Sequence, residues 1–135
     1  MAKAKATIAT CDQCLEGQYQ DEVQQSNCKP CSAGKWNDQR GLEAESQCIL
    51  CDKGRYSTAR GAESRCNKCA AGKQNSNNGS NSSDACAKCG IDMKAAGEGS
   101  LECVACGNGL FSQEGATVCL KCDAGKQIVE AIFRL

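Results

Sequence analysis

The chain has 135 residues, 14 of them cysteine, and its 16 basic and 16 acidic side chains give a formal net charge of zero. This balance argues against a nucleic-acid partner, and no stretch reaches the roughly 20 apolar residues of a membrane span. Leu, Ile, Val and Phe number only 18, so cross-links must supply the stability that a hydrophobic core cannot. Such a cysteine content is typical of disulfide scaffolds in oxidising compartments, which predicts an extracellular or cell-surface protein.

An N-terminal arm, residues 1–10, precedes the first cysteine and lacks the apolar segment of a secretion signal, so we expect a mature chain or a piece of a longer one. From there every cysteine belongs to a C-x-x-C pair. Cutting before each pair divides the chain into tandem repeats, here numbered 1 to 7: residues 11–27, 28–47, 48–65, 66–85, 86–102, 103–118 and a divergent copy from 119 onward. The paired cysteines span residues 11–122, and an apolar C-terminal tail follows at 123–135.

Two glycines and an aromatic residue recur at fixed places in the repeat. The first glycine lies three residues after the second cysteine, at Gly17, Gly34, Gly54, Gly72, Gly109 and Gly125, and only repeat 5 differs, with Asp92. Four of the five aromatic residues lie two positions later, at Tyr19, Trp36, Tyr56 and Phe111. The second glycines are Gly41, Gly61, Gly79, Gly99 and Gly115. We expect positive φ at the first glycine, a short strand after it, and an aromatic ring over a disulfide at the neck of a hairpin-like loop.

The pattern C-x-x-C-x-x-G-x-Y-S-x-x-x-G-A-x-S-x-C-x-x-C at residues 48–69 resembles the ephrin-receptor-like cysteine-rich repeat. It is also similar to the short first module of tumour-necrosis-factor receptor ectodomains. Arrays of such repeats are typical of surface and matrix proteins of algae and protists and of animal ectodomains. The resemblance covers residues 11–125, but it is weak in repeat 4, where Gln74 replaces the aromatic, and weakest in repeat 5. It implies a small disulfide-rich fold, an elongated tandem array of short β-hairpin-like repeats with little regular secondary structure and no catalytic residue.

The resemblance also implies a disulfide pairing, from the second cysteine of one pair to the first of the next. Applied here, it gives Cys14–Cys28, Cys31–Cys48, Cys51–Cys66, Cys69–Cys86, Cys89–Cys103 and Cys106–Cys119. Cys11 and Cys122 are left over, and they could join successive copies head to tail in an intermolecular disulfide. The alternative is an interlaced scheme that joins first to first and second to second cysteines, which needs an even number of pairs.

Metal and catalytic chemistry are the rival interpretations of the cysteines. The 16-residue gaps after Cys31 and Cys69 fit a four-cysteine zinc ribbon, but seven pairs leave one unused and the chain has no histidine. A thioredoxin-like role needs a βαβ pattern that the sequence lacks. No nucleophile lies beside a recognisable base. We therefore expect no catalytic residue, no metal site and no cofactor.

Two kinds of surface modification are predicted. Asn78 and Asn81 begin N-x-S sequons in a polar segment, which could carry N-glycans in a secreted protein or form a bare flexible loop. Ser57, Thr58 and Ser112 are hydroxyls that could carry O-glycans.

The first functional hypothesis is a structural protomer or segment of an extracellular fibre, surface coat or flagellar-hair-type filament that self-associates into a polymer. The second is a ligand-binding ectodomain of a cysteine-rich receptor-like protein, with Leu110, Phe111 and the end of the tail as its candidate hot spot. That end, residues 128–135, contains Ile128, Val129, Ile132, Phe133 and Leu135. We expect it to dock on another surface as a short helix or strand, because a free apolar end favours aggregation.

Overall fold

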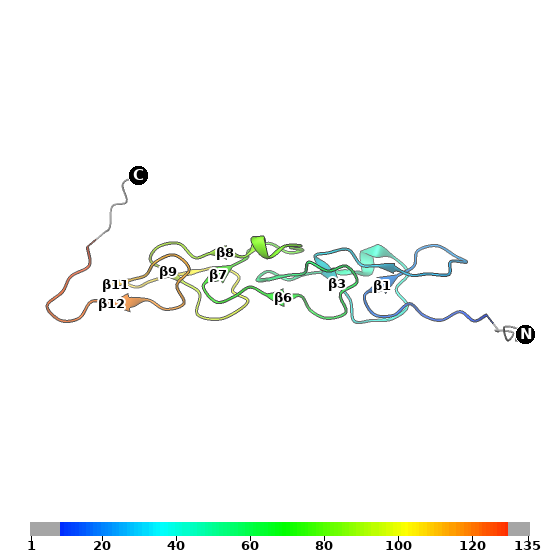
Figure 1. Cartoon of the computed structure of the whole chain (residues 1–135), viewed down its shortest axis with the longest axis horizontal. Helices are drawn as coiled ribbons and strands as arrows, with labels where there is room; N and C mark the ends of the chain where they lie inside the picture. The colour runs from blue at the N-terminus through cyan, green and yellow to red at the C-terminus, as the bar shows by residue number, and fades with distance from the viewer. Residues whose placement is uncertain (1–8, 130–135) are drawn as a thin grey trace, which may run out of the picture.

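The structure, a computed structural model, describes residues 9–129. It is an elongated array in which one hairpin follows another along a single long axis (Figure 1). The expected tandem array of β-hairpin-like cysteine repeats is thereby confirmed. No helix among residues 9–129 has both the length and the apolar character needed to cross a membrane.

Six antiparallel hairpins make up the array, and each has two strands of two residues. The outgoing strands directly follow the first-glycine position: β1 (Gln18–Tyr19), β3 (Lys35–Trp36), β5 (Arg55–Tyr56), β7 (Lys73–Gln74), β9 (Met93–Lys94) and β11 (Leu110–Phe111). The returning strands lie between the two cysteines of the next pair: β2 (Lys29–Pro30), β4 (Ile49–Leu50), β6 (Asn67–Lys68), β8 (Ala87–Lys88), β10 (Val104–Ala105) and β12 (Leu120–Lys121). Each hairpin therefore takes its second strand from the following repeat.

A tight turn precedes every outgoing strand, and it explains the first glycine. In repeat 2 the Lys35 N–H donates to the Ser32 carbonyl over 3.1 Å, with Gly34 at φ +86° as the third residue of the turn. A type II turn requires positive φ at that position, which glycine adopts without steric cost. The equivalent bond recurs in every repeat, so the positive φ expected from the sequence is confirmed.

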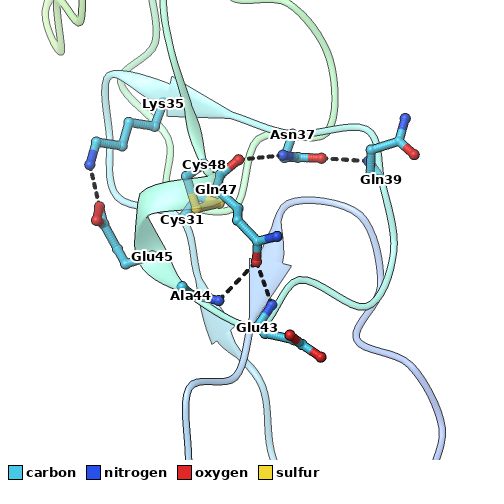
Figure 2. Close-up of a disulfide and its surroundings, with 9 residues drawn as sticks. All are labelled: Cys31, Lys35, Asn37, Gln39, Glu43, Ala44, Glu45, Gln47 and Cys48. Atoms are coloured by element: carbon cyan, nitrogen blue, oxygen red, sulfur yellow. Dashed lines mark hydrogen bonds and ion pairs between the residues drawn. A yellow bond between two sulfur atoms is a disulfide. The ribbon is translucent and has the colours of Figure 1, made fainter.

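Two short 3₁₀ helices, η1 (Glu45–Gln47) and η2 (Ser83–Ala85), lie in the longest loops, those of repeats 2 and 4. Ser82 caps η2 by accepting the Asp84 N–H at its Oγ over 3.0 Å. At η1, Gln47 Oε1 accepts the Glu43 and Ala44 N–H groups over 2.6 and 3.0 Å (Figure 2). The extra residues of these loops are thus ordered by local hydrogen bonds rather than by apolar packing.

Sulfur replaces the hydrocarbon core of an ordinary domain. The second cysteines of repeats 2 to 5 are fully buried, and Leu42 and Ala95 are the only residues other than cysteine in the buried hydrophobic core of the described part of the chain. The expected aromatic contact is found in repeat 1, where Tyr19 packs on Cys31, Cys48 and Leu42. The ring therefore packs against the disulfide of the next repeat's loop.

Candidate functional site

Six disulfides run along the array, each with Cα atoms 5.6 to 5.9 Å apart. They join Cys14–Cys28, Cys31–Cys48, Cys51–Cys66, Cys69–Cys86, Cys89–Cys103 and Cys106–Cys119. These are the pairs of the sequential scheme that the resemblance implies. Cys11, which is exposed, and Cys122, which is half-buried, are free. Residues 9–129 contain no group of three or more His, Cys, Asp or Glu side chains placed to hold a metal ion.

The feature that organises the molecule is a backbone contact between each repeat and the next, here called the consecutive-repeat contact. In it the N–H of the second glycine donates to the carbonyl of the second cysteine in the preceding repeat. This bond occurs five times, at 2.7 to 2.9 Å: Gly41 to Cys14, Gly61 to Cys31, Gly79 to Cys51, Gly99 to Cys69 and Gly115 to Cys89. Because the donor and the acceptor belong to the backbone, the contact tolerates wide variation of the loop side chains.

Two further backbone bonds complete most consecutive-repeat contacts. The residue after the aromatic position donates its N–H to the residue after the next repeat's second glycine, as in Asn37 to Ala62 at 3.1 Å. The residue at the first-glycine position also donates its N–H to the next repeat, to the carbonyl of the residue that follows the aromatic position there, as in Gly34 to Ser57 at 2.9 Å. The first of these bonds occurs in repeats 1 to 5 and the second in repeats 2 to 5.

A second-neighbour contact links each of repeats 1 to 4 to the repeat two places further on. A methyl group placed on Gly34 would lie 2.5 Å from the carbonyl oxygen of Gly79, far inside van der Waals contact. Gly17, Gly54 and Gly72 meet the backbone of Gly61, Gly99 and Gly115 in the same way. The first glycine is therefore required twice, for the turn that it forms and for the loop that closes over it.

Buried polar side chains fill the loops, and the sequence analysis missed them. The Asn37 Nδ2 donates to the Gln47 carbonyl over 2.6 Å, and its Oδ1 accepts the Gln39 N–H over 2.6 Å (Figure 2). Asn75 in repeat 4 bonds the Arg55 carbonyl at 3.1 Å. Both asparagines directly follow the aromatic position, where a small residue recurs in the sequence. That recurrence was the signal available for finding them.

The same position corrects the expectation of O-glycans on two serines. Ser57 and Ser112 are buried, with 5% and 4% of their surface exposed. The Ser112 hydroxyl donates to the Met93 carbonyl over 2.7 Å, and Ser57 Oγ donates to the carbonyl of Ala59. A hydroxyl held inside a loop cannot carry a sugar in the folded protein. Thr58 is exposed.

Gln74, which weakens the resemblance of repeat 4, makes a specific contact. Its Oε1 accepts the N–H of Cys103, two repeats further on, over 2.7 Å. The residue that replaces the aromatic thus reinforces the second-neighbour relation between repeats 4 and 6 by a hydrogen bond.

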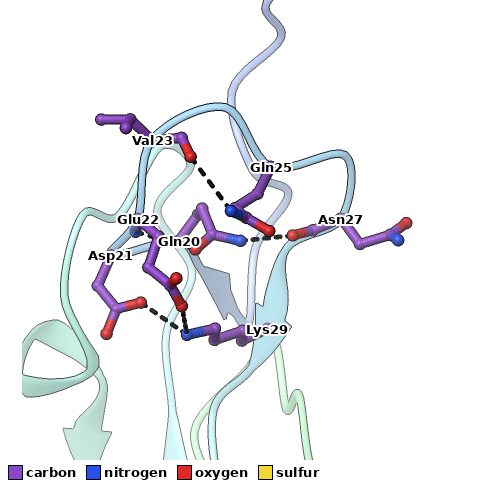
Figure 3. A network of polar contacts seen from close by, with 7 residues as sticks. All are labelled: Gln20, Asp21, Glu22, Val23, Gln25, Asn27 and Lys29. Atoms are coloured by element: carbon purple, nitrogen blue, oxygen red, sulfur yellow. Dashed lines mark hydrogen bonds and ion pairs between the residues drawn. The ribbon is translucent and has the colours of Figure 1, made fainter.

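Ion pairs lie on the solvent-exposed surface of the array. Lys29 Nζ lies 2.8 Å from Asp21 Oδ1 and 2.8 Å from Glu22 Oε2, and it bridges the ends of the first loop (Figure 3). The Lys29 hydrogen bond lowers the pKa of Asp21, and the two carboxylates raise the pKa of Lys29. Glu16 accepts a backbone hydrogen bond and then the Arg40 guanidinium at 3.2 Å, which lower its pKa and tie repeat 1 to repeat 2. These groups are open to solvent, so they contribute little to stability.

The remaining predicted residues lie on the surface. Asn78 and Asn81 are exposed, and so are Ile128 and Val129 at the start of the expected docking segment. Ile132, Phe133 and Leu135 fall outside the described residues. Leu110 is exposed on β11 and Phe111 is half-buried beside it. A shallow hollow of about 330 Å³ lies nearby, lined by residues 112–118 and Leu120.

Comparison with protein families identifies one matching family, described as tyrosine-protein kinase ephrin type A/B receptor-like, at residues 3–48. The match spans repeat 1 and repeat 2 as far as the cysteine that closes its loop. No curated protein matches the chain. The family match and the six-bridge ladder together support an ephrin-receptor-like cysteine-rich array, as the sequence predicted. The matching family is a receptor-like disulfide-rich domain rather than a catalytic one.

Proposed function

We propose that this chain is a structural segment of an extracellular fibre, surface coat or flagellar-hair-type filament. The observation that supports this most directly is the unbroken series of consecutive-repeat contacts, in which backbone hydrogen bonds alternate with disulfides. Contacts of this kind hold a thin rod in shape without a wide apolar core, and within residues 9–129 each repeat contacts only the repeats one and two places away along the array. Cystines persist in oxidising compartments, which fits an extracellular location.

Self-association would turn such rods into a polymer. Cys11 and Cys122 come near the beginning and the end of the described residues 9–129 and are free, so a disulfide from Cys122 of one copy to Cys11 of the next would join copies head to tail. The contact is heterologous, and heterologous contacts build open filaments when their rotation does not close. Residues 128–135 would add an apolar anchor to the same assembly.

N-glycans on Asn78 and Asn81 would suit a surface component. Both side chains are exposed in the loop of repeat 4. The sequon hydroxyl of Ser80 accepts the Asn75 Nδ2–H over 2.8 Å, so the folded loop already uses it. Transfer of a glycan to Asn78 would therefore precede folding of this loop. Mass analysis of tryptic peptides before and after glycosidase treatment would measure the occupancy of each site.

A ligand-binding ectodomain is the second candidate function. The observation in its favour is that exposed Val118 and Leu120 line the hollow of repeat 6, since binding hot spots cluster around such apolar anchors. The hollow is shallow, and no charged side chain lines it except Glu114. We therefore rank the ectodomain function second.

Electron microscopy of the native material separates the two functions. Ordered filaments with a repeat near the length of one rod would support the structural function. Isolated rods at every concentration would contradict it and favour the ectodomain. A Cys11→Ser, Cys122→Ser double variant serves as the matched control, because loss of filaments in that variant alone assigns the junction to the two free cysteines.

A further inference from the structure

Positive φ occurs at two residues other than glycine in the described chain, Gln24 at 59° and Asp92 at 64°. Each occupies a place that glycine holds in other repeats. Gln24 lies seven residues after Gly17, the interval that separates the two glycines of repeats 2 to 4, and Asp92 holds the first-glycine place of repeat 5. The backbone path is therefore kept where the glycine is lost, although the conformation is unfavourable for a residue with a Cβ atom.

Asp92, like Gly109 and Gly125 after it, is exposed, and in this it differs from the first glycines of repeats 1 to 4. The first glycines of repeats 1 to 4 are buried, because the loop two repeats further on closes over each of them. Asp92 is exposed. At Gly34 an added Cβ would lie 2.5 Å from the Gly79 carbonyl oxygen. The Cβ of Asp92 thus occupies the space that a further loop would need, and it blocks a second-neighbour contact at this position.

The carboxylate of Asp92 also accepts a backbone hydrogen bond, from the Ser112 N–H, that a carbonyl of a further loop would otherwise accept. In repeats 1 to 5 the N–H after the aromatic position donates to a carbonyl of the next repeat, at 3.0 to 3.2 Å. In repeat 6 the equivalent N–H, that of Ser112, donates instead to Asp92 Oδ1 at 3.2 Å. The Asp92 backbone keeps its ordinary bonds, from its N–H to the Ser112 carbonyl at 2.9 Å and from the Cys106 N–H to its carbonyl at 2.8 Å.

The loop of repeat 1 is the complementary surface on a second copy. The Gln20 carbonyl, the Gln24 N–H and the Gln25 carbonyl hold the places that bond to the preceding repeat elsewhere in the array, and none has a backbone partner within residues 9–129. At the other end of the array the Cys106 carbonyl and the Gly109 N–H are without backbone partners in the same range. These groups match in donor and acceptor sense, so among residues 9–129 the region of Asp92 is what opposes continued stacking of one copy on another.

We propose that Asp92 is a capping residue that closes the C-terminal face of the array to the N-terminal loop of a second copy. Its Cβ excludes the incoming loop, and its carboxylate satisfies the Ser112 N–H that this loop would have bonded. The capping role of Asp92 does not depend on the proposed filament function, but it limits how copies can join in such a filament. A disulfide between Cys122 and Cys11 of successive copies must then form at a junction that differs from continued repeat stacking.

Substitutions at position 92 separate the two roles, in a Cys11→Ser, Cys122→Ser background that prevents disulfide-linked copies. Asp92→Asn keeps both the Cβ and a side-chain acceptor, Asp92→Ala keeps only the Cβ, and Asp92→Gly keeps neither. Sedimentation equilibrium measures association, and NMR measures the exchange rate of the Ser112 amide. The Ala95 amide, which bonds the Ala116 carbonyl at 3.1 Å, reports whether the neighbouring fold is intact.

We expect the Ser112 amide to exchange roughly tenfold faster in Asp92→Ala than in the parent or Asp92→Asn, with Ala95 unchanged, because a hydrogen bond to a charged acceptor is lost. The dilute Asp92→Gly monomer should show the same acceleration, and its Ser112 amide should regain protection in the oligomer, where the incoming loop supplies the acceptor. Only Asp92→Gly should form end-to-end oligomers. A parent or Asp92→Ala chain that associates as readily as Asp92→Gly would overturn the steric role, and so would an Asp92→Gly chain that stays monomeric. Unchanged exchange of Ser112 in Asp92→Ala would overturn the role of the carboxylate.

Discussion

Replacing Gly34 with alanine tests whether the second-neighbour contact holds the array together. The variant places a methyl group 2.5 Å from the Gly79 carbonyl oxygen and 3.2 Å from the Gly79 carbonyl carbon. Gly109→Ala is the matched control, because Gly109 has nearly the same φ, +80° against +86°, but no atom within 4 Å of the added methyl group. The two variants therefore share the backbone cost of positive φ and differ only in the clash.

The shared cost is about 1 to 2 kcal/mol, the penalty for an L-residue in the left-handed region. Overpacking adds about 1 to 3 kcal/mol to Gly34→Ala alone, since the obstacle is backbone that cannot rotate away. We therefore expect Gly34→Ala to lose about 2 to 5 kcal/mol of unfolding free energy and Gly109→Ala about 1 to 2 kcal/mol.

Denaturant unfolding with the disulfides intact gives the overall loss, but an array can unfold in parts. Amide exchange at Gly34 and Gly79 locates the effect, because these N–H groups donate to Ser57 at 2.9 Å and to Cys51 at 2.7 Å. Exchange at both should accelerate in Gly34→Ala and stay unchanged in Gly109→Ala. Equal destabilisation by the two substitutions would refute the argument, because it would show that φ alone decides the cost.

Three further predictions follow from the contacts around the repeats. Gln74→Ala removes the acceptor of the Cys103 N–H, so we expect exchange of that amide to rise roughly three- to tenfold, and an unchanged rate would show that the bond is not formed in solution. The Asp21 carboxylate, whose pKa the Lys29 hydrogen bond holds below its ordinary value of 3.8, should titrate closer to that value in Lys29→Met, as followed by NMR. Because its folded pKa is lowered, its small contribution to stability is present above pH 4 and is lost as the pH falls through the folded pKa. Peptide mapping of the unreduced monomer should return six sequential bridges and two alkylated thiols, at Cys11 and Cys122, whereas interlaced bridges would contradict the ladder.

The elongated hairpin array was predictable from sequence because each of its rules is local. A glycine three residues after a cysteine marks a turn, and the turn directs the next two residues into a strand. The distance along the chain between bonded cysteines is short, so the loop closes without help from remote residues. Repeat 5 departs from this rule, because Asp92 adopts the glycine conformation without being glycine, and backbone bonds to Ser112 and Cys106 of repeat 6 accompany the turn.

The polar side chains that bond within a loop or reach another repeat were not predictable in the same way. Asn37 and Gln74 look like ordinary polar loop residues, and Gln74 looked like a defect in the pattern. Their partners, the Gln47 carbonyl and the Cys103 N–H, lie 10 and 29 residues away. The expectation of O-glycans on Ser57 and Ser112 was wrong because both hydroxyls are buried. Their burial depends on which loop covers them, and the sequence does not show this.

The amino-acid sequence by itself determined the repeat, its turns and the fact that cross-links stand in for a core, since composition and spacing along the chain suffice for these. Only the tertiary structure decided that each loop closes over the glycine two repeats earlier, that Tyr19 covers the bridge of the next loop, and that Asp92 lies uncovered with its carboxylate on Ser112. The physical reason is that turn formation depends on neighbours in the chain. Stacking depends on backbone groups brought together from different repeats. Every residue except proline carries the same backbone groups, so the sequence does not show which of them will pair.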